Sequence, residues 1–97
     1  MYDPILMANK FEQLAYMARD ANTEYEKAAV YAAATAIALE FEKISNDYGA
    51  YALETVAKAR WSICAAVGYD NTDGHSKEQH VTFALDAASM LKEVYFG

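Results

Sequence analysis

Apolar residues recur every three to four positions along most of the chain, and alternation with a period of two is nowhere sustained. This spacing is typical of amphipathic helices. It predicts an all-α fold, a compact bundle of about four helices. Because the chain contains no linker, internal repeat or low-complexity tract, residues 1–97 are predicted to form a single helical domain.

The first predicted helix begins at Pro4, with Asp3 as its N-cap. Its apolar face comprises Met7, Phe11, Leu14, Ala18 and Ala21. A capping-box pattern at residues 23–26 (Thr-Glu-Tyr-Glu) predicts a second helix start. Since neither glycine nor proline lies between the two segments, residues 4–48 are compatible with two helices or with one long helix.

The second predicted helix runs to about Tyr48 and has two apolar faces. One face carries Val30, Ala33, Ile37, Phe41, Ile44 and Tyr48, and the other carries Ala28, Ala29, Ala32, Ala36 and Leu39. A helix that is apolar on two sides is usually packed between neighbours. We therefore expect it to be central, with its alanine stripe (Ala28, Ala29, Ala32 and Ala36) against another helix.

The third predicted helix covers Ala50–Val67, between Gly49 and Gly68. Its apolar stripe comprises Leu53, Val56, Ala57, Ile63, Cys64 and Val67. Arg60 lies within this stripe, either as a partner-binding residue in a groove or as a snorkelling residue paired with a carboxylate of another helix. Trp61 is either the rim of the core or an interface anchor.

A turn-rich loop at residues 68–75 precedes the fourth predicted helix, which opens with a capping box at residues 76–79 (Ser-Lys-Glu-Gln). Its predicted core face comprises Val81, Phe83, Ala84, Leu85, Ala87, Ala88, Met90, Leu91 and Val94. Its predicted polar edge comprises Glu78, Thr82, Asp86, Ser89 and Glu93.

No motif indicates catalysis, so we expect no enzyme activity, no metal site and no cofactor. The loop at Asp70–Gly74 fails the calcium-loop pattern, and neither His75 nor His80 has a glutamate three residues before it, as a di-iron site requires. Cys64 falls on an apolar stripe, where a cysteine acts as a small hydrophobe. A small-molecule pocket near Arg60, Trp61 and Cys64 is a further alternative.

Compartment signals point to a cytoplasmic protein. The first four residues carry an acid where a secretory signal has basic residues, and no apolar segment follows them. The longest apolar run, residues 28–39, spans about 18 Å as a helix, short of the roughly 30 Å hydrocarbon core. The single cysteine requires no oxidising compartment.

The charge is the remaining signal: 14 acidic against 8 basic residues, a formal net charge of −6. Such a surface repels phosphate backbones, which argues against direct nucleic-acid binding. The acids concentrate between residues 20 and 47 and from residue 69 onward, so they favour a basic partner. Tyr2, Tyr16, Tyr51 and Tyr69 are predicted to be exposed, as interface tyrosines are. The predicted partner-binding residues are Glu40, Glu42, Tyr69, Asp70, Asp73, Glu78, Asp86 and Glu93.

In its size, acidity and lack of catalytic motifs, the whole chain resembles small phage-encoded anti-CRISPR proteins that mimic double-stranded DNA, including inhibitors of the type I-F surveillance complex. The resemblance implies a host-cell protein partner with a lysine-rich channel that grips target DNA, in which the carboxylates above would replace phosphates. Eight basic residues dilute the acids, so the mimicry would be patchy.

We therefore expect a non-enzymatic inhibitor that occupies the basic DNA-binding site of a nucleic-acid-handling complex. The alternative is a self-assembling or adaptor protein without a link to nucleic acid, in which the alanine stripe packs against a second copy as a homodimer.

Overall fold

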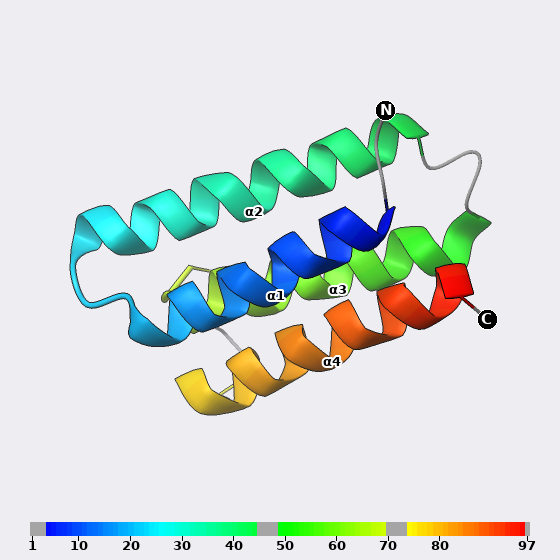
Figure 1. The fold of residues 1–97 in the computed structure, drawn as a ribbon. Coiled ribbons are helices and arrows are strands. Elements are labelled where there is room, and N and C mark those ends of the chain that lie inside the picture. The colour runs from blue at the N-terminus through cyan, green and yellow to red at the C-terminus, as the bar shows by residue number, and fades with distance from the viewer. Residues whose placement is uncertain (1–3, 45–48, 70–73, 97) are drawn as a thin grey trace.

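Four helices make up the fold, and the predicted all-α class is confirmed (Figure 1). The computed structural model describes residues 4–44, 49–69 and 74–96. The helices are α1 (Pro4–Asp20), α2 (Glu24–Ile44), α3 (Gly49–Ala66) and α4 (Lys77–Phe96), with no strand in these ranges. A break at residues 21–23 divides residues 4–44 into two helices, which removes the single-helix alternative.

The helices alternate in direction, as in an up-and-down bundle, with α1 and α3 running opposite to α2 and α4 (Figure 1). The bundle measures 36 × 22 × 19 Å. The α4 helix packs extensively on both α3 and α1. The α2 helix contacts α3 and α1 less extensively, and within the described residues it does not contact α4. It is thus a peripheral helix laid on a three-helix unit.

One large apolar side chain from each helix is completely buried, namely Phe11, Phe41, Ile63 and Leu91. The predicted apolar face of α1 is buried throughout, and so are most predicted core positions of α4. Val94 lies among the residues whose side chains are not described. No helix in the described ranges is both long enough and apolar enough to cross a lipid bilayer.

Both predicted capping boxes are present. At the start of α2, the Thr23 backbone N–H donates to Glu26 Oε1 at 3.0 Å, and the Glu26 N–H donates to Thr23 Oγ1 at 3.1 Å. At the start of α4, the Ser76 N–H donates to Gln79 Oε1 at 2.8 Å, and the Gln79 N–H donates to Ser76 Oγ at 3.2 Å. Each pair satisfies backbone donors that the first helical turn leaves unpaired. The proposed N-cap Asp3 lies outside the described residues.

The end of α3 is a Schellman motif centred on Gly68, which has a φ of 97°. The Gly68 N–H donates to the Ala65 carbonyl at 3.0 Å, and the Tyr69 N–H donates to the Cys64 carbonyl at 2.9 Å. A positive φ is strained for residues with a Cβ, which explains the glycine predicted to end this helix. Gly49, predicted to precede α3, is instead its first residue.

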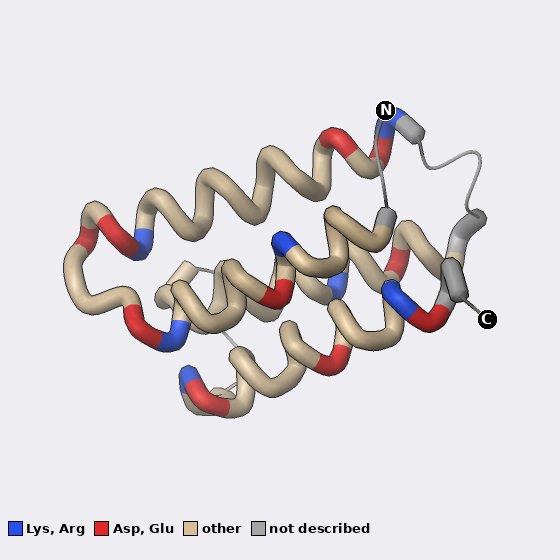
Figure 2. Tube along the Cα trace, in the orientation of Figure 1, with Lys and Arg blue, Asp and Glu red and all other residues tan. Residues whose placement is uncertain are grey.

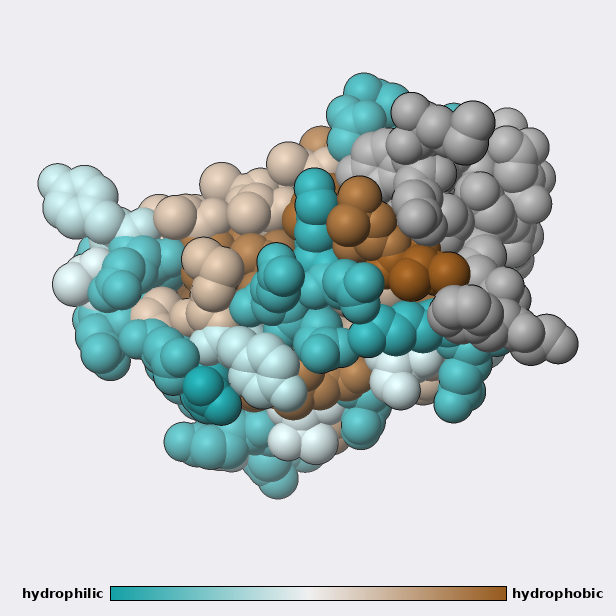
Figure 3. Space-filling view, in the orientation of Figure 1, coloured by the Kyte–Doolittle hydropathy of each residue, from teal (hydrophilic) through white to brown (hydrophobic). Residues whose placement is uncertain are grey.

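The prediction that the second helix is central was wrong. A single stripe of α2 is buried (Val30, Ala34, Ala38 and Phe41), whereas the alanine stripe and Leu39 are exposed. In Figure 3 pale brown atoms run along the upper edge of the molecule, over α2. Because α2 contacts only α3 and α1 within the described residues, one stripe of it is covered and the alanine stripe is not. Tyr48 lies outside the described residues.

Candidate functional site

Three acids of the predicted partner-binding set lie along the solvent-facing edge of α4, namely Glu78, Asp86 and Glu93. Glu78 lies in the first turn, and all five residues of the predicted polar edge are exposed. Asp86 and Glu93 are seven residues apart, so they lie on the same side of the helix about 10 Å apart along its axis. This edge is a ridge of separated carboxylates.

The other predicted acids do not join this ridge. Glu40 and Glu42 lie near the end of α2, at the opposite end of the bundle from the first turn of α4, where Glu78 lies (Figures 1 and 2). Glu93 lies near the same end as Glu40 and Glu42, but on a helix that α2 does not contact within the described residues. Asp70 and Asp73 lie outside the described residues. The predicted set therefore covers several surfaces.

The acids of α4 differ from four of the acids of α1 and α2 because they form no ion pairs within the described residues. Four acids of α1 and α2 form ion pairs with basic side chains, and Figure 2 shows acidic and basic positions next to each other on these two helices and at both ends of α4. The pairs are Asp20–Arg19 at 3.0 Å, Glu24–Lys27 at 3.8 Å, Glu40–Lys43 at 3.0 Å and Glu12–Lys92 at 2.7 Å. Within the described part of the chain, Glu78, Asp86 and Glu93 have no ion-pair partner.

Tyr69 has a packing role that its sequence position did not indicate. Its ring stacks on that of Tyr31 of α2, with the centroids 4.5 Å apart and the planes at 26°. Tyr16, Tyr51 and Tyr69 are exposed, as predicted, whereas Tyr2 lies outside the described residues. Tyr25, which is 90% exposed, was missed. This exposure was predictable from the sequence, because Tyr25 lies inside the capping box, before the apolar stripe of α2 begins.

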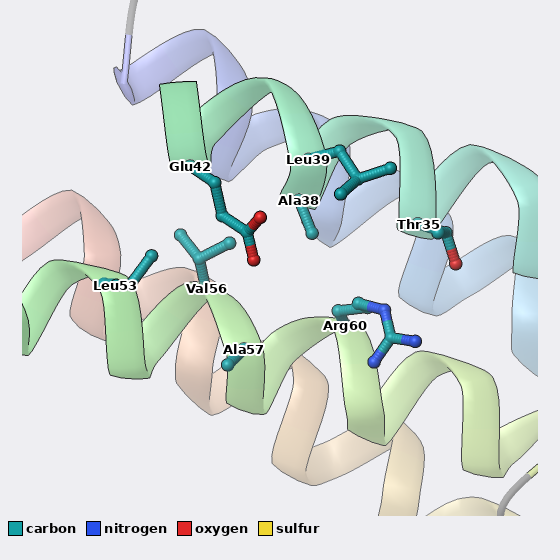
Figure 4. A pocket seen from close by; sticks show the side chains of 8 residues that line it. All are labelled: Thr35, Ala38, Leu39, Glu42, Leu53, Val56, Ala57 and Arg60. Carbon is teal, nitrogen blue, oxygen red and sulfur yellow. The ribbon is translucent and has the colours of Figure 1, made fainter. Parts of the chain in front are cut away.

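A groove separates the second half of α2 from the middle of α3 (Figure 4). This α2–α3 groove has a volume of about 460 Å³. It is lined by Thr35, Ala38, Leu39 and Glu42 of α2 and by Leu53, Val56, Ala57 and Arg60 of α3. The Glu42 carboxylate points into the groove near one end, and the Arg60 guanidinium lies at the other end. The groove therefore has apolar walls with one charge of each sign.

Arg60 lies in a groove, but the ion pair expected from a snorkelling arginine is not observed. It is half-buried, and within the described residues no carboxylate lies within ion-pair distance. Ala57 lies one turn before Arg60 and was predicted to be buried, but it is exposed to the groove. Both outcomes have one cause, because α2 covers only part of this side of α3.

The α2–α3 groove, which Arg60 lines, includes neither Trp61 nor Cys64, the other two residues of the predicted pocket. Cys64 is fully buried, and the half-buried Trp61 packs edge-on against His80 with ring centroids 5.2 Å apart. His75 and Phe83 also make edge-on contacts with His80, at 5.9 Å each. Trp61 thus belongs to the rim of the core within this aromatic cluster, whereas Arg60 lines the α2–α3 groove.

Full burial of His80 was missed by the sequence analysis. Its signal was present, because His80, Ala84, Ala87 and Leu91 continue one stripe at helical spacing, and all four are fully buried. Within the described ranges, no group of three or more His, Cys, Asp or Glu side chains is placed to hold a metal ion.

Comparison of the chain with protein-family models, with curated proteins and with solved structures finds no match.

Proposed function

We propose that this chain is a non-enzymatic inhibitor that binds a nucleic-acid-handling complex at its basic DNA-binding site, as DNA-mimicking anti-CRISPR proteins do. The binding edge is the solvent-facing side of α4, with Glu78, Asp86 and Glu93. One observation carries the proposal: these carboxylates are exposed and have no ion-pair partner in the described residues, whereas four acids of α1 and α2 are paired.

The chemistry is electrostatic competition. Carboxylates about 10 Å apart on a rigid helix present negative charge to lysines and arginines that otherwise bind phosphates. A helix spaces them better than a loop, because its backbone is already ordered and costs no further entropy on binding. Binding of this kind speeds association and weakens as ionic strength rises.

The first test is capture of the partner followed by competition. Tagged chain serves as bait in lysate of the native host, and the bound protein is challenged with excess duplex DNA. We expect duplex DNA to displace the partner, and we expect Asp86→Lys/Glu93→Lys to weaken binding at least about a hundredfold, roughly tenfold for each reversed charge.

The matched control is Asp20→Lys/Glu24→Lys, which changes the net charge equally but alters acids already paired with Arg19 and Lys27. This variant is expected to retain most of the affinity. Equal losses in the two variants would show that net charge rather than the α4 edge controls binding. A partner that duplex DNA does not displace would contradict the mimicry itself.

A further inference from the structure

The α2–α3 groove is self-complementary, and we propose that two copies of this chain pair through it about a two-fold axis. The surface lies on α2 and α3, whereas the proposed inhibitor edge lies on α4, so the two proposals stand independently. Three features of the groove point to a second copy as its occupant: a protruding leucine, a pair of opposite charges, and an apolar extension along α2.

Leu39 is the protruding residue. It is 53% exposed and lines two hollows, the α2–α3 groove and a second hollow of about 460 Å³ on the outer side of α2. The nearby groove walls include the apolar side chains of Leu53, Val56 and Ala57. In a two-fold interface the same patch faces itself, so Leu39 of each copy can enter the groove of the other as a knob enters a hole.

The charges at the two ends of the groove have the symmetry that such pairing requires. Glu42 lies near one end and Arg60 at the other (Figure 4). A two-fold axis across the middle of the groove places Glu42 of one copy beside Arg60 of the other, and makes the same contact a second time. Guanidinium and carboxylate form strong, directional pairs. The second copy thus supplies Arg60 with a carboxylate that the described residues of its own chain do not provide.

The exposed alanine stripe extends this surface along α2. Small side chains let two helices approach closely, so α2 of one copy can lie antiparallel to α2 of the other. We expect a dimer that forms at roughly micromolar concentration.

Sedimentation analysis of the purified chain over a concentration series tests the pairing. The wild type is expected to be a monomer–dimer equilibrium. Leu39→Asp places a charge in the apolar contact and is expected to raise the dimer Kd at least about tenfold. Leu6→Asp is the matched control, because Leu6 of α1 is 52% exposed and does not line the groove. It is expected to leave the dimer unchanged.

A charge swap tests the two-fold geometry. Arg60→Glu and Glu42→Arg each place like charges together across the axis, so each single variant is expected to weaken the dimer, whereas the double variant restores the pairing. Circular dichroism melts verify that every variant remains folded.

The proposal is overturned by a wild type that stays monomeric at all concentrations, by a dimer that survives Leu39→Asp unchanged, or by a double variant that does not recover the dimer. Assembly beyond a dimer would also overturn it, because a two-fold interface closes on itself.

Discussion

At the scale of single residues, Glu26 has the best-defined electrostatic role. Its carboxylate accepts hydrogen bonds from the backbone N–H groups of Thr23 at 3.0 Å and Asn22 at 3.3 Å. The backbone of Thr23, then that of Asn22, then the Thr23 hydroxyl hold the pKa of Glu26 below its ordinary value of 4.5. Hydrogen bonding to the charged form is the dominant cause.

Because the pKa of Glu26 is lowered, the stability that this helix cap contributes depends on pH. The folded state binds this proton more weakly than the unfolded state, so the stabilisation is complete above the unfolded pKa and is lost as pH falls through the lower folded pKa. We expect the free energy of unfolding to fall below about pH 4.5 more steeply in the wild type than in Glu26→Gln. Urea denaturation over a pH series measures this. Glu54→Gln, at an exposed position of α3, is the control and should follow the wild type.

At the scale of elements, local chemistry sets the helix ends, whereas the buried face of α2 depends on its neighbours. The capping boxes at Thr23–Glu26 and Ser76–Gln79 and the glycine end of α3 form where the sequence predicts them, because each motif is completed within a few residues. Which stripe of α2 is buried depends on neighbours that are distant in sequence.

The end of α3 provides the prediction at this scale. A Cβ at Gly68 would meet no atom within 4 Å, so the cost of a substitution arises from the backbone alone. We expect Gly68→Ala to lower the free energy of unfolding by about 1 kcal/mol, the cost of a left-handed conformation, and Gly68→Asn to lower it by less. Urea denaturation distinguishes the two. An alanine variant as stable as the wild type would contradict the role assigned to this glycine.

At the scale of the whole molecule, three helices form a close unit and the fourth lies across it. The extensive contacts of α4 with α1 and α3 bury the centre of the bundle, whereas α2 leaves a groove along α3. Stability is therefore expected to depend mainly on α1, α3 and α4, while α2 presents an exposed apolar surface.

A substitution at Leu91 tests whether stability depends mainly on the unit formed by α1, α3 and α4. It is fully buried on α4, so we expect Leu91→Ala to lower the free energy of unfolding by about 3 kcal/mol through lost burial and a cavity. Leu6→Ala removes the same atoms from a side chain that is 52% exposed, and should change stability by less than about 0.5 kcal/mol. Thermal and urea melts of the two variants make the comparison. Similar losses would show that the core is not centred on α4.

The sequence by itself determined the all-α class, the two capping boxes and the buried faces of α1 and α4, because these depend on short-range hydrogen bonds and on one clear apolar stripe per helix. It also indicated a groove position for Arg60 and an exposed acidic edge on α4. The partner-binding roles of these residues stay predictions.

Only the tertiary structure decided where α2 lies, which alanines are exposed, and that Glu42 and Arg60 lie at opposite ends of a groove between α2 and α3. These outcomes depend on which helices meet. Two apolar faces on one helix permit several packings, and the choice among them follows from the shapes and areas of all four helices together.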